Sequence, residues 1–469
     1  MTPGKNTATL SIKKKKPPKS ELIKDESKKK NKVWVISVDG GYGHARAAYP
    51  LKDIAYNRII TANSDKIVSP KEKKLWISAQ SAYEWLSRAS ELPLVGKLIW
   101  GAYDHFQAIE PAYPIKDRSF PTLSTLLQYR LIKKGICKSL INHIKRTPLP
   151  IFTTYFTPAY AAYLEKLSPI YCLVTDTDIN RAWVALNPRK STIIYFAPTK
   201  QAARRLLQYG VPREKLIYSG FPLPKENLGG PNLPIAKNDL AQRLVNLDPK
   251  RKYLDRYQPV IVKGLAPAKL PPKPNRPLTI LYAIGGAGAQ KSIAEQIISS
   301  MREKLINREV RLFLSAGTRL DVVDYFREIC WTILGIEPSK KSPITIISSL
   351  TKRGYFELFN QALRESDVLW TKPSELVFYT ALGLPIIIAP PLGSHEVFNR
   401  NWLVNMGAGY VQEDPKATAS WLFDWLRSGM LAEAAWQGFT EAPQQGTYII
   451  EDVLTGSITP KPICDEDIC

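Results

Sequence analysis

Several residue types that build common sites are scarce in this chain of 469 residues. It has five cysteines, scattered without a Cys-x-x-Cys pair, and only four histidines: His44, His105, His143 and His395. A disulfide framework needs an even set of cysteines, and a structural zinc site needs closely spaced cysteines or histidines. The sequence therefore argues against both, predicts no metal site and no cofactor, and fits a reducing cytoplasm.

Long apolar runs and the common phosphate-binding loops are also missing. No uncharged apolar stretch reaches the roughly 18 residues that a membrane-spanning helix needs. The chain contains no Gly-x-x-x-x-Gly-Lys-[Ser/Thr] loop, which excludes the P-loop NTPases. Gly41 and Gly43 begin like a dinucleotide-binding fingerprint, but Arg46 stands at the position of its third glycine, so that fingerprint fails.

Positive charge is abundant, with a formal net charge of +23. Residues 1–32 hold eleven lysines against three acidic residues and almost no apolar ones. Such a segment cannot bury a core, so we expect a disordered basic tail, and it lacks the apolar region of a signal peptide. About +15 remains beyond the tail, which favours anionic partners such as nucleotide phosphates or an anionic lipid surface. We expect a cytoplasmic protein, either soluble or peripheral on the inner face of the membrane.

Strand-like apolar runs alternate with helical patterns from residue 33 onward, which predicts α/β architecture with parallel sheets covered by helices. The predicted strands are 33–38, 149–153, 170–175, 192–196, 278–284, 310–315, 344–347, 367–370 and 385–389. Helical patterns include 199–209, 290–305 and 355–365. We expect two Rossmann-like lobes facing a cleft, with ligands at the carboxyl ends of the strands.

The lobes are predicted at 33–222 and 278–415. Between them, residues 223–277 are rich in proline and glycine, and we interpret them as an interdomain region with one short helix near 237–247. Residues 416–469 form a helical tail. Residues 72–145 are helical in tendency, aromatic and basic, and either pack as amphipathic helices on the first sheet or expose one face to a bilayer.

One stretch, residues 370–410, carries a specific pattern: Lys372-Pro373-Ser374, then Gly383-Leu384-Pro385, then His395-Glu396-x-x-Asn399. It resembles the nucleotide-sugar half of GT-B glycosyltransferases, of the branch that contains the monogalactosyl- and glucosyl-diacylglycerol synthases and the lipid II N-acetylglucosaminyl transferase. The resemblance extends over most of residues 33–410. It includes the glycine turns at 40–43 and 285–288, the segment VTDTDINRAW at 174–183, and the hinge-like segment 197–223.

The resemblance implies which residues bind the donor. Its diphosphate would meet the backbone amides of Gly285, Gly286 and Gly288 and the helix start after Lys372, which can act without a metal. Sugar hydroxyls and ribose would be held by polar side chains of the same lobe. The implied donor-binding residues are Gly285, Gly286, Gly288, Lys372, Ser374, Glu375, His395, Glu396 and Asn399.

The acceptor side of the cleft is implied at the first glycine turn, Gly40, Gly41 and Gly43, followed by His44. A histidine there is able to accept the hydroxyl proton of an acceptor, although it could equally bond to the turn or cap the helix. Asp176 is a second candidate for the base or for a group that binds the acceptor. Alternatively, Asp176 has only a structural role as a carboxylate at the end of a strand.

Together these features predict an inverting glycosyltransferase that moves a sugar from a nucleotide-sugar donor, with UDP as the expected nucleotide, to a lipid or polyprenyl-linked acceptor. One departure stands out, because the ribose-binding glutamate of the family falls on Phe378, one helical turn beyond Glu375. The alternatives are an inactive GT-B binding protein and a nucleotide-sugar epimerase. The aromatic residues cluster in predicted helices and no recognisable nucleic-acid-binding module appears, which argues against nucleic acid as the partner.

Overall fold

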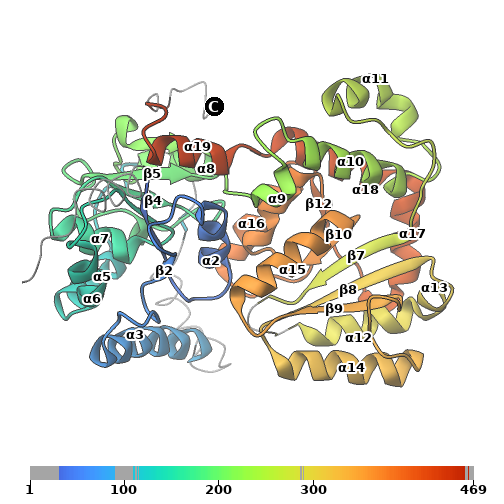
Figure 1. The fold of residues 1–469 in the computed structure, drawn as a ribbon, viewed down its shortest axis with the longest axis horizontal. Coiled ribbons are helices and arrows are strands. Elements are labelled where there is room, and N and C mark those ends of the chain that lie inside the picture. The colour runs from blue at the N-terminus through green and yellow to red at the C-terminus, as the bar shows by residue number, and fades with distance from the viewer. Residues whose placement is uncertain are drawn as a thin grey trace, which may run out of the picture.

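The computed structural model describes residues 31–89, 109–110, 114, 116–285, 288, 290–459 and 463. The lysine-rich tail that we expect to be disordered lies almost entirely outside the described residues, and so do Gly286 and His105. Two α/β lobes lie side by side, one built from the first half of the chain and one from the second (Figure 1).

The first lobe contains a six-stranded, fully parallel sheet in the order β2-β1-β3-β4-β5-β6. Its strands are β1 (Trp34–Ser37), β2 (Ile60–Thr61), β3 (Ile151–Thr153), β4 (Ile170–Leu173), β5 (Ile193–Ala197) and β6 (Leu216–Tyr218). All four residues of β1 are buried, because helices cover both faces of the sheet and every side chain of a central strand meets a core.

The second lobe repeats this plan with a parallel sheet in the order β12-β11-β10-β7-β8-β9. Its strands are β7 (Leu278–Ala283), β8 (Val310–Gly317), β9 (Ile344–Ser348), β10 (Val368–Thr371), β11 (Ile386–Ile388) and β12 (Gly409–Val411). The predicted α/β class with two Rossmann-like lobes is confirmed by these two parallel sheets.

Helices join the strands in both lobes. The first lobe has α2 (Gly43–Ala48), α3 (Pro70–Ala89), α5 (Leu123–Lys133), α6 (Lys138–Ile144), α7 (Phe156–Leu164) and α8 (Lys200–Gln208). The second has α12 (Lys291–Ser300), α13 (Arg302–Ile306), α14 (Leu320–Leu334), α15 (Lys352–Glu365), the 3₁₀ helix η4 (Glu375–Leu382), α16 (Ser394–Asn405), α17 (Thr418–Ser428) and α18 (Met430–Glu441). Thr199 and Thr351 start α8 and α15 as N-caps, since each side chain accepts a hydrogen bond from the backbone three residues on.

The proline-rich region between the sheets differs from the expected linker with one short helix. It holds α9 (Lys225–Leu228), α10 (Pro234–Leu247) and α11 (Leu254–Leu265). On α10, the buried Arg243 donates hydrogen bonds to the backbone carbonyls of Ser366, Leu382 and Gly383, and burial lowers its pKa to about 10. These bonds attach α10 to the second lobe, so most of this region is part of that lobe. The sequence indicated a linker here because prolines usually interrupt helices. In the structure, however, Pro234 occupies the first turn of α10 and Pro259 lies inside α11.

The chain crosses between the lobes a second time after α18. The last described helix, α19 (Gly446–Leu454), lies over the first lobe, where it contacts the 3₁₀ helix η1 (Tyr49–Leu51) (Figure 1). The two crossings touch each other: a Cβ added at Gly220 would lie 2.6 Å from Pro443, and one added at Gly446 would lie 2.3 Å from the carbonyl oxygen of Phe221. Glycine is required at both positions because the two backbones pass too closely for any side chain.

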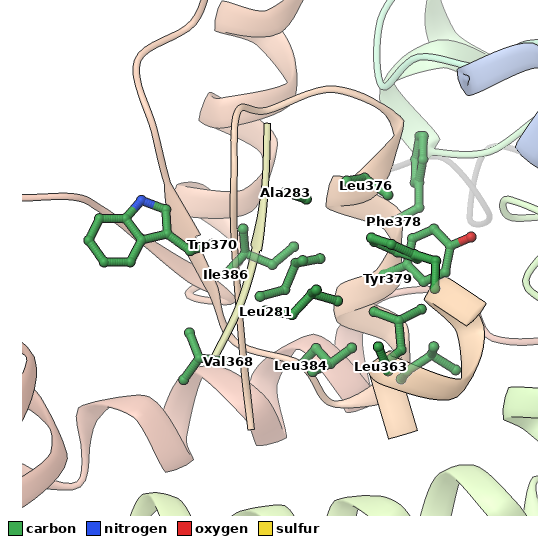
Figure 2. Close-up of a cluster of buried hydrophobic side chains, with 14 of the residues drawn as sticks. Leu281, Ala283, Leu363, Val368, Trp370, Leu376, Phe378, Tyr379, Leu384 and Ile386 are labelled. Carbon is green, nitrogen blue, oxygen red and sulfur yellow. The ribbon is translucent and has the colours of Figure 1, made fainter. Parts of the chain in front are cut away.

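The core of the second lobe lies on both faces of its sheet. Val368 and Trp370 point to one side of β10, whereas Leu281, Leu384 and Phe378 gather on the other, beneath η4 (Figure 2). This core is continuous with the core on one face of the first sheet, where Val35 and Phe196 belong to the same apolar cluster. The carboxyl ends of both sheets therefore face each other across a closely packed boundary.

Candidate active site

The glycine turns after β1 and β7 meet at one cavity of about 250 Å³ between the lobes. It is lined by Gly40, Gly41, Tyr42, Gly43, His44, Thr175, Asp176, Gly285, Lys372, Ser374, Glu375, His395 and Glu396. Most of the residues that the sequence singled out are therefore brought together in space. Among those predicted, Gly286 lies outside the described residues, while Gly288 and Asn399 do not line the cavity.

His44 is the second residue of α2 and is half-buried at the cavity. Its Nδ1 lies 2.8 Å from the carbonyl oxygen of Thr154, which can only accept, so Nδ1 carries the hydrogen in the neutral ring. The lone pair is then on Nε2. Burial lowers the pKa of His44, while the negative charge of Asp176 acts in the opposite direction. The ring is thus a neutral base near pH 7, with its orientation fixed by a backbone carbonyl.

Lys372 and Glu396 form an ion pair inside the donor half of the cavity. Glu396 is almost fully buried, and its Oε2 accepts a hydrogen bond of 2.7 Å from the backbone N–H of Leu392. The Lys372 side chain lies over Gly285, where an added Cβ would come within 2.9 Å of Cε. Gly285 also has a φ of +73°, which explains why glycine stands at this turn. An ammonium group and the N-terminus of α16, which carries His395 and Glu396, therefore face the same space.

Asn399 is buried in a network that joins the lobes. Its Oδ1 accepts hydrogen bonds from the backbone N–H and the hydroxyl of Thr177, at 3.0 and 2.8 Å. Its Nδ2 donates to the carbonyl of Pro373 at 3.1 Å and to Asp176 at 3.4 Å. Because both polar atoms of the amide are committed to these partners, the structure places Asn399 behind Asp176, as a support of the cavity wall.

Phe378 does not reach the cavity. Its ring stacks on Phe221 with centroids 4.4 Å apart and an interplanar angle of 7°, and lies 5.5 Å from the ring of Trp402. Phe221 belongs to the first crossing between the lobes. The position of the ribose-binding glutamate of the family is therefore filled by apolar packing at the hinge, while Glu375, at the start of η4, lines the cavity.

Arg46 is a site residue that the sequence did not assign. Its buried guanidinium reaches from α2 into the second lobe, where Nε lies 3.2 Å from Oε1 of Glu375 and Nη2 donates to the hydroxyl of Tyr355 at 3.0 Å. It also lies over the rings of Phe359 and Phe356, with distances of 4.1 and 4.8 Å to their centroids. The one trace of it in the sequence is that Arg46 stands where a dinucleotide-binding fingerprint would have its third glycine.

Two further contacts hold the first glycine turn against the second lobe. Tyr42 accepts a hydrogen bond of 2.9 Å from the backbone N–H of Thr318, and Lys352 pairs with Asp39 at 2.6 Å. Across the ranges that the structure describes, no group of three or more His, Cys, Asp or Glu side chains is arranged to hold a metal ion. No helix in those ranges is long and apolar enough to cross a bilayer.

Residues 272–448 match a family described as "Domain of unknown function (DUF6938)". The processive diacylglycerol β-glucosyltransferase of Bacillus subtilis (strain 168) is 19% identical over 391 residues, covering 81% of this chain and 83% of that protein. Its counterpart from Bacillus licheniformis is 22% identical over 390 residues, covering 81% of this chain and 82% of that protein.

Among solved structures, this chain is similar to Acinetobacter baumannii MurG, with 13% identity, coverage of 91% and 99% of the two chains and a TM-score of 0.44. The curated relatives are glycosyltransferases by name, which agrees with the class that the motifs predict for this chain. They also confirm the suspected resemblance to the diacylglycerol glycosyltransferase branch.

Proposed function

We propose that this protein is an inverting glycosyltransferase that transfers a hexose from a UDP-sugar to a lipid acceptor of the diacylglycerol or polyprenyl-linked type. The observation that carries the proposal is the arrangement of one cavity, which is lined both by His44, whose lone pair is on Nε2, and by Lys372 and Gly285 of the other lobe. The curated Bacillus relatives, named processive diacylglycerol β-glucosyltransferases, support glucose as the sugar and diacylglycerol as the acceptor.

In this proposal the acceptor hydroxyl lies between His44 and the anomeric carbon of the donor. Its proton passes to Nε2 of His44 as the oxygen attacks the anomeric carbon, and the bond from that carbon to the diphosphate oxygen breaks with inversion. Lys372, the backbone at Gly285 and the N-terminus of α16 stabilise the charge that grows on the diphosphate. The scheme includes no metal ion.

Donor binding would exchange one ion pair for two new contacts. Lys372 and Glu396 are bonded to each other in the structure, and both line the cavity. We propose that Lys372 turns to the diphosphate while Glu396 accepts hydrogen bonds from the sugar hydroxyls. The exchange keeps both buried charges compensated at each stage, which is necessary because an unpaired buried charge is costly.

The first lobe carries an exposed basic and apolar surface that supports action at a membrane. On and just before α5, Phe120, Leu123 and Leu126 are exposed, and the same helix carries exposed Arg130 and Lys133. Such a mixture of apolar side chains and cations is suited to an anionic leaflet, where each basic residue contributes roughly 1 kcal/mol. We propose that this surface brings the protein to its lipid acceptor.

The proposal is tested by transfer and binding assays on the same protein. UDP-, GDP- and ADP-glucose are incubated with vesicles of anionic lipid containing diacylglycerol, with and without a chelator, and the product anomer is assigned by NMR. We expect a β-linked product from UDP-glucose, loss of transfer in His44→Ala, and weaker UDP-glucose binding in Glu396→Gln but not in the exposed control Glu413→Gln. A product of retained configuration, or no binding of any of the three nucleotides, overturns the proposal.

A nucleotide-sugar epimerase is the second candidate, because three carboxylates, Asp176, Glu375 and Glu396, line the same cavity. Two of them are bound to cations, Glu375 to Arg46 and Glu396 to Lys372, which leaves Asp176 as the carboxylate closest to that role. Incubating the protein with UDP-N-acetylglucosamine in the absence of any acceptor distinguishes the epimerase from the glycosyltransferase. A new epimer in the NMR spectrum favours the epimerase, and binding without any turnover favours an inactive member.

A further inference from the structure

We infer that Arg46 is a positioning residue that crosses from the acceptor lobe to hold Glu375 of the donor lobe in place, so that Glu375 grips the ribose of the nucleotide. The inference rests on the proposed function and adds to it a residue outside the resemblance. It starts from the pair itself: Arg46 belongs to α2, Glu375 opens η4, and the two side chains lie 3.2 Å apart.

The donor lobe provides a seat for the Arg46 guanidinium. Phe356 and Phe359 of α15 present their rings to it, and the Tyr355 hydroxyl accepts from Nη2 while bonding to the Ser315 hydroxyl at 2.7 Å. A planar guanidinium fits such a site because it stacks on aromatic faces while Nη2 donates to Tyr355, which an ammonium group cannot reproduce. The buried Nε makes no hydrogen bond among the described residues, so its contact with Glu375 is an ion pair. These contacts hold the Arg46 guanidinium in place, and the guanidinium in turn orients the carboxylate of Glu375.

Glu375 then faces the cavity in one orientation. Its Oε1 is directed toward Arg46, and its Oε2 lies near Gly43, where an added Cβ would be 3.4 Å away. Phe378 is excluded from this task by its stack on Phe221. Glu375 is therefore the carboxylate of η4 that a ribose can reach, and a fixed carboxylate binds a diol better than a mobile one because less rotamer entropy is lost on binding.

The test measures discrimination at the ribose by calorimetry with UDP, 2′-deoxy-UDP and 3′-deoxy-UDP. For the wild type we expect UDP to bind roughly 10- to 100-fold more tightly than its weaker deoxy form, the range for a hydrogen bond to a charged group. In Glu375→Gln we expect UDP and the deoxy form to bind with dissociation constants that differ by less than about threefold. In Arg46→Met, which keeps the apolar contact with the two phenylalanines, we expect the same collapse, and the double variant should lose nothing more.

Matched variants separate positioning from general structure. Arg353→Met removes an exposed arginine of the same helix α15 and should leave the ratio unchanged. Arg46→Lys and Tyr355→Phe, which keep part of the seat, should retain an intermediate ratio, so the inference stays testable if Arg46→Met does not fold. Equal weakening of UDP and both deoxy forms in Arg46→Met, or an unchanged ratio in Glu375→Gln, overturns the inference. Absence of UDP, GDP and ADP binding by the wild type overturns the proposed function as well.

Discussion

Replacing Asn399 by alanine should destabilise the protein strongly although Asn399 does not line the cavity. The amide is fully buried and makes two bonds to Thr177 across the lobe boundary and one to the carbonyl of Pro373 within its own lobe. Alanine leaves the buried backbone N–H of Thr177 without its acceptor, at a cost of about 1–3 kcal/mol, and removes two further bonds at about 1 kcal/mol each. The expected loss is about 3–5 kcal/mol.

The assay is thermal unfolding followed by differential scanning fluorimetry and circular dichroism. For a cooperative unit of about 150–250 residues, each kcal/mol shifts Tm by about 2–4 °C, so Asn399→Ala should lower Tm by about 6–20 °C. Asn401→Ala is the matched control, because Asn401 lies on the same helix, is exposed, and accepts hydrogen bonds only from its exposed neighbour Arg400 among the bonds recorded for the described residues. Surface changes of this kind stay within about 0.5 kcal/mol. A Tm for Asn399→Ala within 2 °C of the Asn401→Ala control would refute the reasoning.

Three further outcomes are expected. The His44 imidazole, whose NMR signal is assigned with His44→Gln, should have a pKa below the ordinary value of about 6.5, because burial disfavours the cation. As the pH falls, the unfolded chain binds the proton first, so the stability contributed by neutral His44 is present above about pH 6.5 and declines below it. A pKa above about 6.5 for His44 contradicts this prediction. Phe378→Ala should cost about 3–5 kcal/mol in urea unfolding through loss of its stack on Phe221, against almost nothing for the exposed Phe120→Ala, and equal midpoints would count against that packing. Arg243→Lys should lower Tm by several degrees, since one ammonium group cannot satisfy the carbonyls that the guanidinium reaches; an unchanged Tm would show that those bonds contribute nothing.

Most strands could be predicted from sequence, and three short strands at sheet edges could not. All nine predicted strands correspond to strands of the structure, from β1 to β11, because buried strands of a parallel sheet appear as continuous apolar runs. The three that were missed, β2, β6 and β12, lie at sheet edges and have only two or three residues each. Such segments are held by one neighbour and carry little pattern of their own.

The cavity was predictable to the extent that its residues follow strand ends. His44, Asp176, Lys372 and Glu375 all come shortly after β1, β4 or β10, and parallel sheets gather such positions at one edge. Contacts across the cleft were not predictable, because they depend on how the lobes are docked. Arg46 and Glu375 form an ion pair although they are 329 positions apart in the sequence, and no local pattern around either residue predicts the contact.

The path of the chain through the lobes has a topological consequence. It leaves the first lobe near Gly220, builds the second, and returns at Gly446 to finish on the first, with both crossings in mutual contact. The donor lobe is thus an insertion whose two ends meet at a single point. An insertion joined in this way can rotate about one hinge, because both of its connections to the first lobe lie at the same place. The first lobe contains the chain segments that precede and follow the insertion. Opening of the cleft by such a swing changes backbone torsions at the paired crossing and leaves both sheets intact, but it must also break the contacts between the lobes, among them Arg46 with Glu375 and Asn399 with Thr177.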